Sequence, residues 1–171
     1  MSIVYSVCIE KRGDKLSKII LEDTRQKPEK TAYIREQLEA LGYEVKRTKI
    51  YCGDYTFPTN QSICIDTKQD LQEVVSNVIQ QHTRFRDECI RAKEAGIQLV
   101  ILVTDPTVKT LSDVFGWYNP RKRYSPKATS GRQLGKVLYS MREKYGVQFE
   151  FCTKNQVGKR IVEILGGDTN V

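Results

Sequence analysis

The sequence contains no long apolar run, and this absence argues against a membrane-spanning helix. The most apolar stretch is Ile97-Gln-Leu-Val-Ile-Leu-Val103, whereas a spanning helix needs about 20 apolar residues. The N-terminal residues MSIVYSVCIEKRG lack the basic segment and the small-residue cleavage site of a signal peptide. We therefore expect no membrane association and no secretion, and a location in the cytoplasm, or in the nucleus of a eukaryote.

Histidine and paired cysteines are also scarce. His82 is the only histidine, and the five cysteines, at positions 8, 52, 64, 89 and 152, include no CxxC pair. This composition provides no Cys/His set with the usual zinc spacing, and we expect reduced thiols. His82 and Cys89 lie seven residues apart, about 10 Å along a helix, which is too far for a nucleophile and its base.

Acidic residues become rare toward the C-terminal end. Residues 1–117 hold 17 Lys/Arg and 17 Asp/Glu, whereas residues 118–171 hold 11 Lys/Arg and only four acids. The second segment therefore accounts for the entire net charge of +7. Such a basic region suggests a polyanion such as nucleic acid as partner, although basic surfaces also occur without that role.

The alternation of expected elements predicts the fold class. The 171 residues contain no repeat, low-complexity tract or linker, so we expect one domain over residues 1–171. Strands are predicted at 18–23, 44–51, 54–57, 62–68, 97–103 and 147–152, and helices at 29–41, 70–78, 83–95, 132–145 and 155–165. Strands that alternate with helices around the buried run 97–103 indicate an α/β sheet covered on both faces.

Two acids and a lysine form the strongest candidate for a chemical site. Asp54 follows Gly53, and Asp66 and Lys68 end the other strand of a predicted hairpin, with Thr67 between them on the opposite face. Two carboxylates at one end of a hairpin can hold Mg²⁺ and leave positions for water and a phosphate. A neighbouring lysine can orient water or offset charge that develops on the phosphate.

These residues match a known signature. Asp54 followed by Asp66-Thr67-Lys68 resembles the D-(x)n-(D/E)-x-K signature of the PD-(D/E)xK nuclease superfamily. Leu21-Glu-Asp23-Thr-Arg25, Gly53-Asp54 and the helix with Arg84-Phe85 and Cys89 are similar, in order and spacing over residues 19–104, to the XPF-type nuclease domain. This sequence departs from the XPF pattern at the triplet, which is Asp-Thr-Lys instead of Glu-Arg-Lys, and at two acidic positions, where it has Gln26 and Gln72.

The resemblance implies a restriction-endonuclease-like mixed sheet and a metal-dependent DNA endonuclease that acts on branched, flapped or partly single-stranded DNA. It further implies Mg²⁺ or Mn²⁺ as cofactor, roles in DNA repair or recombination, and a homodimer or a partner subunit that supplies junction specificity. By the resemblance, Asp23, Asp54 and Asp66 are metal ligands, Lys68 is the catalytic lysine, Arg25 and Arg84 contact phosphates, and Asp70 and Glu73 are lesser candidates.

Each residue also has an ordinary structural interpretation. Asp54 is then a turn aspartate, and Asp66 and Lys68 are an exposed pair on an edge strand. Asp70 and Glu73 have the spacing of a helix capping box, and we favour this role over that of metal ligands. Arg84 shares its helix with Arg86, Arg91, Asp87, Glu88 and Glu94, so intrahelical ion pairs would explain it equally well.

A basic, aromatic segment with no acidic residue occupies residues 116–131. Prolines at 120 and 126 indicate a loop, and long loops in compact domains are often functional. Basic side chains would contact phosphates and aromatic rings would stack on unpaired bases; the alternative is a solvated loop whose tryptophan is buried in the core. The candidate nucleic-acid contacts in this loop are Trp117, Arg121, Lys122, Arg123 and Lys127.

Two other functions remain open from sequence. A DNA-binding module that keeps the nuclease fold without its activity would show salt-sensitive binding and no metal-dependent turnover. A small α/β interaction protein would bind no nucleic acid at low salt.

Overall fold

The computed structural model describes residues 18–169 and contains one mixed six-stranded sheet. Cys8 and the N-terminal stretch considered above as a signal peptide lie outside the described residues. The strand order is β2-β1-β3-β4-β5-β6, in which β3 runs antiparallel to β1 and β4, and the other neighbours are parallel. The strands are β1 (Ile19–Asp23), β2 (Glu44–Thr48), β3 (Tyr55–Thr56), β4 (Ile63–Lys68), β5 (Gln98–Thr104) and β6 (Gln148–Cys152).

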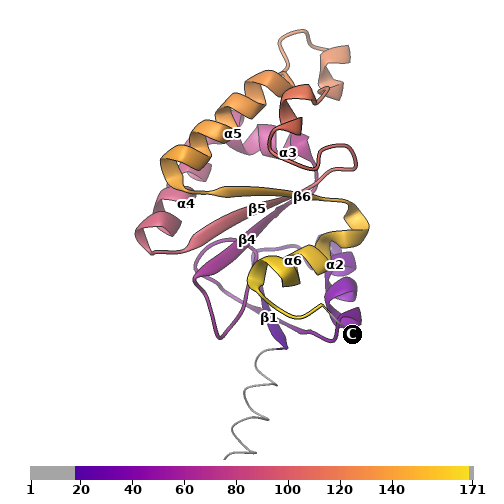
Figure 1. Ribbon diagram of the computed structural model, residues 1–171, viewed down its shortest axis with the longest axis vertical. Coiled ribbons are helices and arrows are strands. Elements are labelled where there is room, and N and C mark those ends of the chain that lie inside the picture. Colours follow the sequence, from indigo (N-terminus) through magenta and orange to yellow (C-terminus); the bar gives the residue numbers. More distant parts are fainter. Residues whose placement is uncertain (1–17, 170–171) are drawn as a thin grey trace, which may run out of the picture.

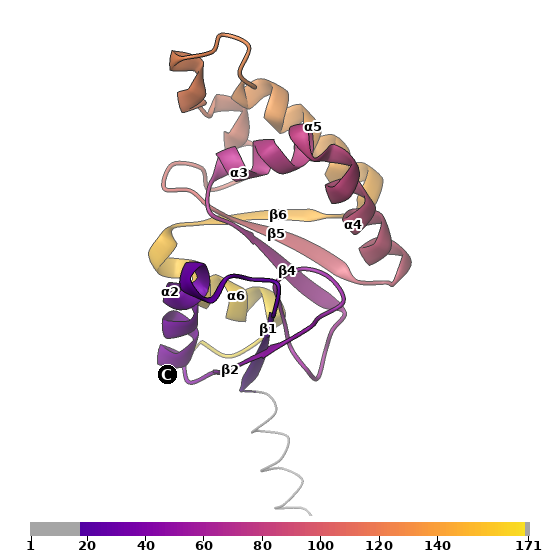
Figure 2. The same ribbon diagram turned by 180° about the vertical axis from the view of Figure 1, so that it is seen from behind.

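Helices cover both faces of this sheet, which confirms the predicted α/β fold (Figure 1). On one face lie α3 (Leu71–Val75), α4 (His82–Glu94) and α5 (Gly131–Tyr145), and on the other lie α2 (Pro28–Ala40) and α6 (Val157–Leu165) (Figure 2). The five central residues of β5 are buried, and they alternate between the two hydrophobic cores. Among residues 18–169, no helix is both long and apolar enough to cross a membrane.

Local signals in the sequence account for most element boundaries. Pro28 occupies the first turn of α2, where its missing N–H costs no hydrogen bond, and Gly42 follows the helix with a φ of +78°. Ser130 and Gln133 form a complete capping box at the start of α5. Asp70 caps α3 as predicted, whereas Glu73 accepts from the N–H of Gln69 instead of closing the box on Asp70.

Two predicted element boundaries need correction, and the predicted loop contains a short helical turn. The strand predicted over 44–51 ends at Thr48, because the N–H of Ile50 donates to the side-chain carboxylate of Asp23 and not to a backbone carbonyl of β1. The helix predicted over 70–78 ends at Val75, and a π-helical turn, Ser76–Gln80, joins α3 to α4. The loop 116–131 contains a 3₁₀ turn, Pro120–Arg123, within its polar sequence.

Candidate active site

The strand register brings Asp54 and Asp66 together. Tyr55 pairs with Ile65 in the antiparallel ladder of β3 and β4, so the two aspartates, one residue further along, stand opposite each other. The N–H of Asp54 donates to the carbonyl of Ile65 at 2.6 Å. Both aspartates are buried, with 5% and 6% of their surface exposed. The interpretation of Asp66 as part of an exposed edge pair is therefore wrong.

Gly53 is required by the turn that delivers Asp54. Its φ is +69°, a left-handed conformation that favours glycine. A Cβ atom at this position would lie 2.8 Å from the carbonyl oxygen of Ile65 and 3.3 Å from Cβ of Cys64. Only glycine lets the chain pass this close to β4, so the turn and the site are parts of one arrangement and not alternatives.

Asp54 is held by three hydrogen bonds. Its Oδ2 accepts from both the N–H and the hydroxyl of Thr67, each at 2.8 Å, and its Oδ1 accepts from the side-chain amide of Gln26. Burial, reinforced by the charge of Asp66, raises the pKa of Asp54 to about 8 despite the opposing effects of Lys68 and Thr67. Alternation placed Thr67 on the opposite face, so the sequence analysis did not identify it as a partner of Asp54.

Lys68 forms a buried ion pair with Asp66. Its Nζ atom lies 2.8 Å from Oδ1 and 2.7 Å from Oδ2, although only Oδ1 has hydrogen-bond geometry and Oδ2 accepts no hydrogen bond within residues 18–169. The two side chains are 9% and 8% exposed. Burial would lower the pKa of Lys68, but the neighbouring Asp66 and Asp54 outweigh it and raise the pKa. The lysine is therefore a fixed cation beside two acids.

Asp23 does not present a free carboxylate to this pair. Its two oxygens accept four hydrogen bonds, from Nε, Nη2 and the N–H of Arg25 and from the N–H of Ile50. Burial would raise the pKa of Asp23, but these donors, Arg25 foremost, outweigh it and lower the pKa. The carboxylate anchors Arg25, and the geometry does not favour the predicted role of Asp23 as a metal ligand.

The helices opposite the aspartates contribute one continuous stripe of polar side chains. A cleft of about 400 Å³ is bounded by Asp54, Asp66, Lys68 and Arg25 on one side. The opposite wall comes from the π-helical turn and α4, at the alternating four- and three-residue spacing of a single helix face: Asn77, Gln81, Arg84, Glu88 and Arg91.

The ion-pair interpretation of this helix holds for only one arginine. Arg86 pairs with its neighbour Asp87, whereas Arg84 and Arg91 make no salt bridge to any residue within 18–169. Glu88, which the sequence assigned to such pairs, instead accepts from the N–H of Gly53 at 3.3 Å. It thereby connects α4 to the turn that carries Asp54.

The basic loop is fixed to the body of the protein by Asn119. This residue is 1% exposed, accepts from the side-chain amide of Gln72 on α3, and donates to the carbonyl of Thr129. Trp117 is half-buried and packs against the core, as in the structural interpretation, so the exposed rings of the loop are Tyr118 and Tyr124. Of the basic contacts predicted in this loop, Arg121 lines a cleft beside α2 and α3, and Lys122, Arg123 and Lys127 stay predictions.

The donors present fit a magnesium ion that retains water. Among residues 18–169, no group of three or more His, Cys, Asp or Glu side chains could hold a metal. Mg²⁺, however, is commonly bound through one or two carboxylates together with water and substrate phosphate. Asp54 and Asp66 supply two, and within residues 18–169 Lys68 is the one cation that forms a salt bridge with either of them.

Comparisons with known proteins bear on the family and the fold. A model of the ERCC4 domain matches residues 22–160. Among solved structures, XPF from Aeropyrum pernix is similar at 19% identity with a TM-score of 0.58, covering 86% of this chain and 59% of that chain. Its complex with DNA gives a TM-score of 0.61 at 19% identity, covering 86% and 63%. The chain thus spans about three-fifths of those structures; no curated protein matches it.

Proposed function

The chain belongs to the ERCC4-domain family, and from this membership and the geometry of the cleft we propose that it is a metal-dependent DNA endonuclease. The reaction is the hydrolysis of a phosphodiester bond, and the substrate is branched or partly single-stranded DNA. The predicted XPF-type resemblance and its restriction-endonuclease-like mixed sheet are confirmed. The activity, metal and substrate are proposals, which the side chains of the cleft support.

One observation carries the proposal. Two buried carboxylates, Asp54 and Asp66, face each other in an open cleft, and within residues 18–169 Lys68 is the one buried lysine that offsets them. Buried carboxylates without matching cations destabilise a fold, and such clusters occur mainly at functional sites. In this family member we assign both carboxylates to a divalent cation, Mg²⁺ or Mn²⁺.

The metal ion and the basic side chains of the cleft have different roles in the proposed reaction. When bound, the metal ion polarises a phosphoryl oxygen and lowers the pKa of a bound water. Lys68 presents a fixed positive charge beside Asp66, where it orients water or offsets charge on the phosphate in the transition state. Arg84 lines the same cleft and forms no salt bridge within the described part of the chain, and Arg25 is held in place by Asp23, so both are disposed to contact phosphate.

Thr67 and Gln26 act through Asp54. Their hydrogen bonds fix the position of its carboxylate and favour its ionised form. Thr67 stands where the XPF pattern has arginine, and Gln26 where it often has glutamate. In this chain the two positions therefore support a carboxylate and supply no charge of their own.

Cleavage of an end-labelled DNA panel tests the proposal. The panel comprises a flap, a fork, a four-way junction, a linear duplex and a single strand, each incubated with Mg²⁺, Mn²⁺ or EDTA. We expect metal-dependent cutting of a branched substrate by the wild type and none by Asp66→Asn. Salt-sensitive binding without cutting of any substrate would instead identify a DNA-binding module with an inactive nuclease fold.

A further inference from the structure

A second, larger cleft continues from the active site. It has a volume of about 540 Å³ and lies between α2, the end of β4 and α3. The two clefts have Arg25, Gln26, Lys68, Glu73 and Ser76 in common, so a strand that crosses the aspartates in one cleft can proceed directly into the other.

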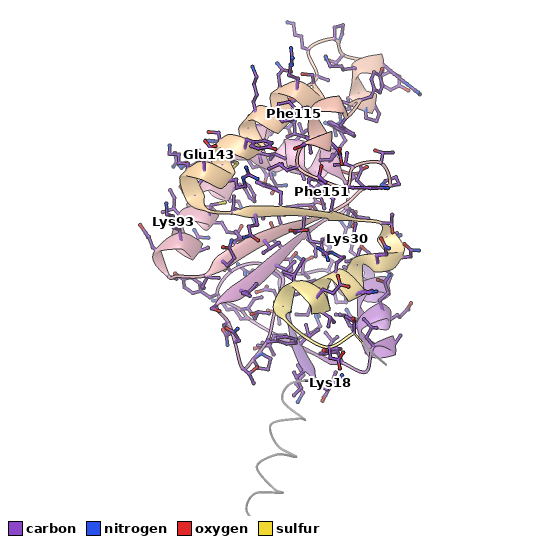
Figure 3. The ribbon with its side chains drawn as sticks, viewed as in Figure 1. Lys18, Lys30, Lys93, Phe115, Glu143 and Phe151 are labelled. Atoms are coloured by element: carbon purple, nitrogen blue, oxygen red, sulfur yellow. The ribbon has the colours of Figure 1, made fainter. Side chains whose placement is uncertain are left out.

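Unpaired cations from separate elements line this second cleft. Lys27 and Lys30 come from the start of α2, and Arg121 comes from the 3₁₀ turn of the basic loop. Within residues 18–169 none of these three side chains makes a salt bridge or a hydrogen bond through its charged group. Lys30 lies on the side toward which β4, β5 and β6 run (Figure 3). These charges are therefore available to an anionic ligand.

The acids of the same cleft are already engaged with the backbone. Asp70 accepts from the N–H of Glu73 at 2.7 Å, and Glu73 accepts from the N–H of Gln69 at 2.8 Å. Each carboxylate thus compensates backbone donors at the start of α3 and forms no salt bridge with the lysines or with Arg121. The basic side chains of this cleft are therefore available to an anionic ligand, whereas its two acids already accept hydrogen bonds from the backbone.

Aromatic rings extend from the same loop. Tyr118 is 60% exposed and Tyr124 is 89% exposed, so both rings are accessible to a ligand. Asn119, buried between Tyr118 and the 3₁₀ turn, fixes this part of the loop to Gln72 on α3. Tyrosine faces stack on unpaired bases, but in a duplex the neighbouring base pairs already cover those faces.

We propose that this second cleft and the tyrosines of the loop bind a single-stranded DNA arm that leaves the active site. Lys27, Lys30 and Arg121 contact its phosphates, and Tyr118 and Tyr124 stack on its bases. The inference rests on the proposed function, because it takes the reacting strand to cross Asp54 and Asp66. It adds a binding subsite for the unpaired arm of the substrate.

Salt-dependent binding in EDTA tests this subsite without any cleavage. The ligands are a duplex, the same duplex with a single-stranded arm, and the arm alone. For Lys30→Ala/Arg121→Ala we expect the slope of log K against log salt for the isolated arm to become less steep by about 1.4, since each lost phosphate contact contributes about 0.7. Binding to the plain duplex should be unchanged. The matched control is Lys93→Ala/Lys136→Ala, which removes the same charge away from both clefts; Lys93 lies at the opposite edge of the molecule from Lys30 (Figure 3).

Tyr124→Ala provides a second, independent readout. We expect roughly 5- to 150-fold weaker binding of the arm, with Tyr124→Phe close to wild type because the ring remains. Equal losses for arm and duplex, or no loss for the arm, would overturn the subsite. Such a failure is distinguishable from failure of the proposed nuclease, since the latter would appear as absence of metal-dependent cutting while arm binding in EDTA remained as described.

Discussion

The ammonium group of Lys68 lies 2.8 Å and 2.7 Å from the two carboxylate oxygens of Asp66, inside the fold. This pair neutralises only one of the two buried aspartates. Asp54 has hydrogen-bond donors but no salt-bridge partner within residues 18–169, and Asp66 faces it across the β3–β4 ladder. Ionisation of both carboxylates would leave one negative charge unmatched, which is the physical reason to expect a cation at this position.

The stability of the metal-free protein should depend on the ionisation of Asp54. Its pKa is raised from 3.8 to about 8, so the folded protein binds more protons than the unfolded chain between these values. In EDTA, the free energy of unfolding should therefore fall as the pH rises from about 5 to 8, by at most roughly 1.4 kcal/mol per pH unit. Asp54→Asn should lack this dependence, and chemical denaturation at several pH values measures the difference.

Magnesium should oppose this loss of stability. Because the cation binds the ionised carboxylates, the wild type should gain stability on addition of Mg²⁺, most strongly at pH 8. Asp54→Asn should gain much less.

For the metal-free experiment, an equal dependence of the free energy of unfolding on pH in wild type and Asp54→Asn would contradict the burial and the charge environment assigned to Asp54.

Calorimetric titration with Mn²⁺ should separate the aspartates by role. Asp66→Asn should abolish the binding heat, because it removes a carboxylate that faces the cleft. Asp23→Asn should retain metal affinity within about threefold and should lower cleavage instead, since Asp23 anchors Arg25 through Nε and Nη2. Loss of metal binding in Asp23→Asn would restore its predicted role as a ligand.

The hydroxyl of Thr67 should also affect the affinity for Mn²⁺. Thr67→Val removes the hydrogen bond to Oδ2 of Asp54 and keeps the side-chain shape and the backbone donor. Residues that orient metal ligands typically affect affinity 10- to 100-fold, so we expect roughly a tenfold weaker Mn²⁺ affinity in the same titration. Thr67→Ser, which keeps the hydroxyl, should stay near wild type; equal losses in both variants would argue against the hydrogen bond as the cause.

Gly53→Ala should lower the free energy of unfolding by more than Gly96→Ala does. Gly53 and Gly96 both have a φ of +69°, but only Gly53 would bring a Cβ atom to within 2.8 Å of a backbone oxygen. Gly96→Ala should cost about 1–2 kcal/mol for the left-handed conformation alone, and Gly53→Ala at least about 1 kcal/mol more. Denaturant unfolding measures both, and equal costs would contradict the close approach to β4.

Much of this arrangement could be predicted from the sequence because its signals are local. Alternation placed Asp66 and Lys68 on one face of a strand, and the hairpin signal paired that strand with the segment after Gly53. The capping role of Asp70 and the apolar run of β5 were equally readable. Each prediction depended on residues that are close in the chain.

Most differences between expectation and structure concern contacts between residues that are distant in sequence. The sequence does not show that Ile50 donates to Asp23, although Arg25, its other donor, lies only two residues away. Glu88 looked like a partner of neighbouring arginines, whereas Gly53 lies opposite it in the fold. Trp117 belongs to a basic, aromatic segment that is typical of nucleic-acid binding, but its burial depends on how the loop packs on the core.

Comparison of wild type with Lys68→Met on its preferred DNA substrate tests the central claim most directly. Methionine keeps most of the buried side-chain volume, and Lys93→Ala serves as the matched charge control. With Mg²⁺ present and folding verified by circular dichroism, we predict a cleavage rate about 100-fold or more below wild type for Lys68→Met and an unchanged rate for Lys93→Ala. A wild-type rate in Lys68→Met would contradict the assignment of this cleft as a nuclease active site.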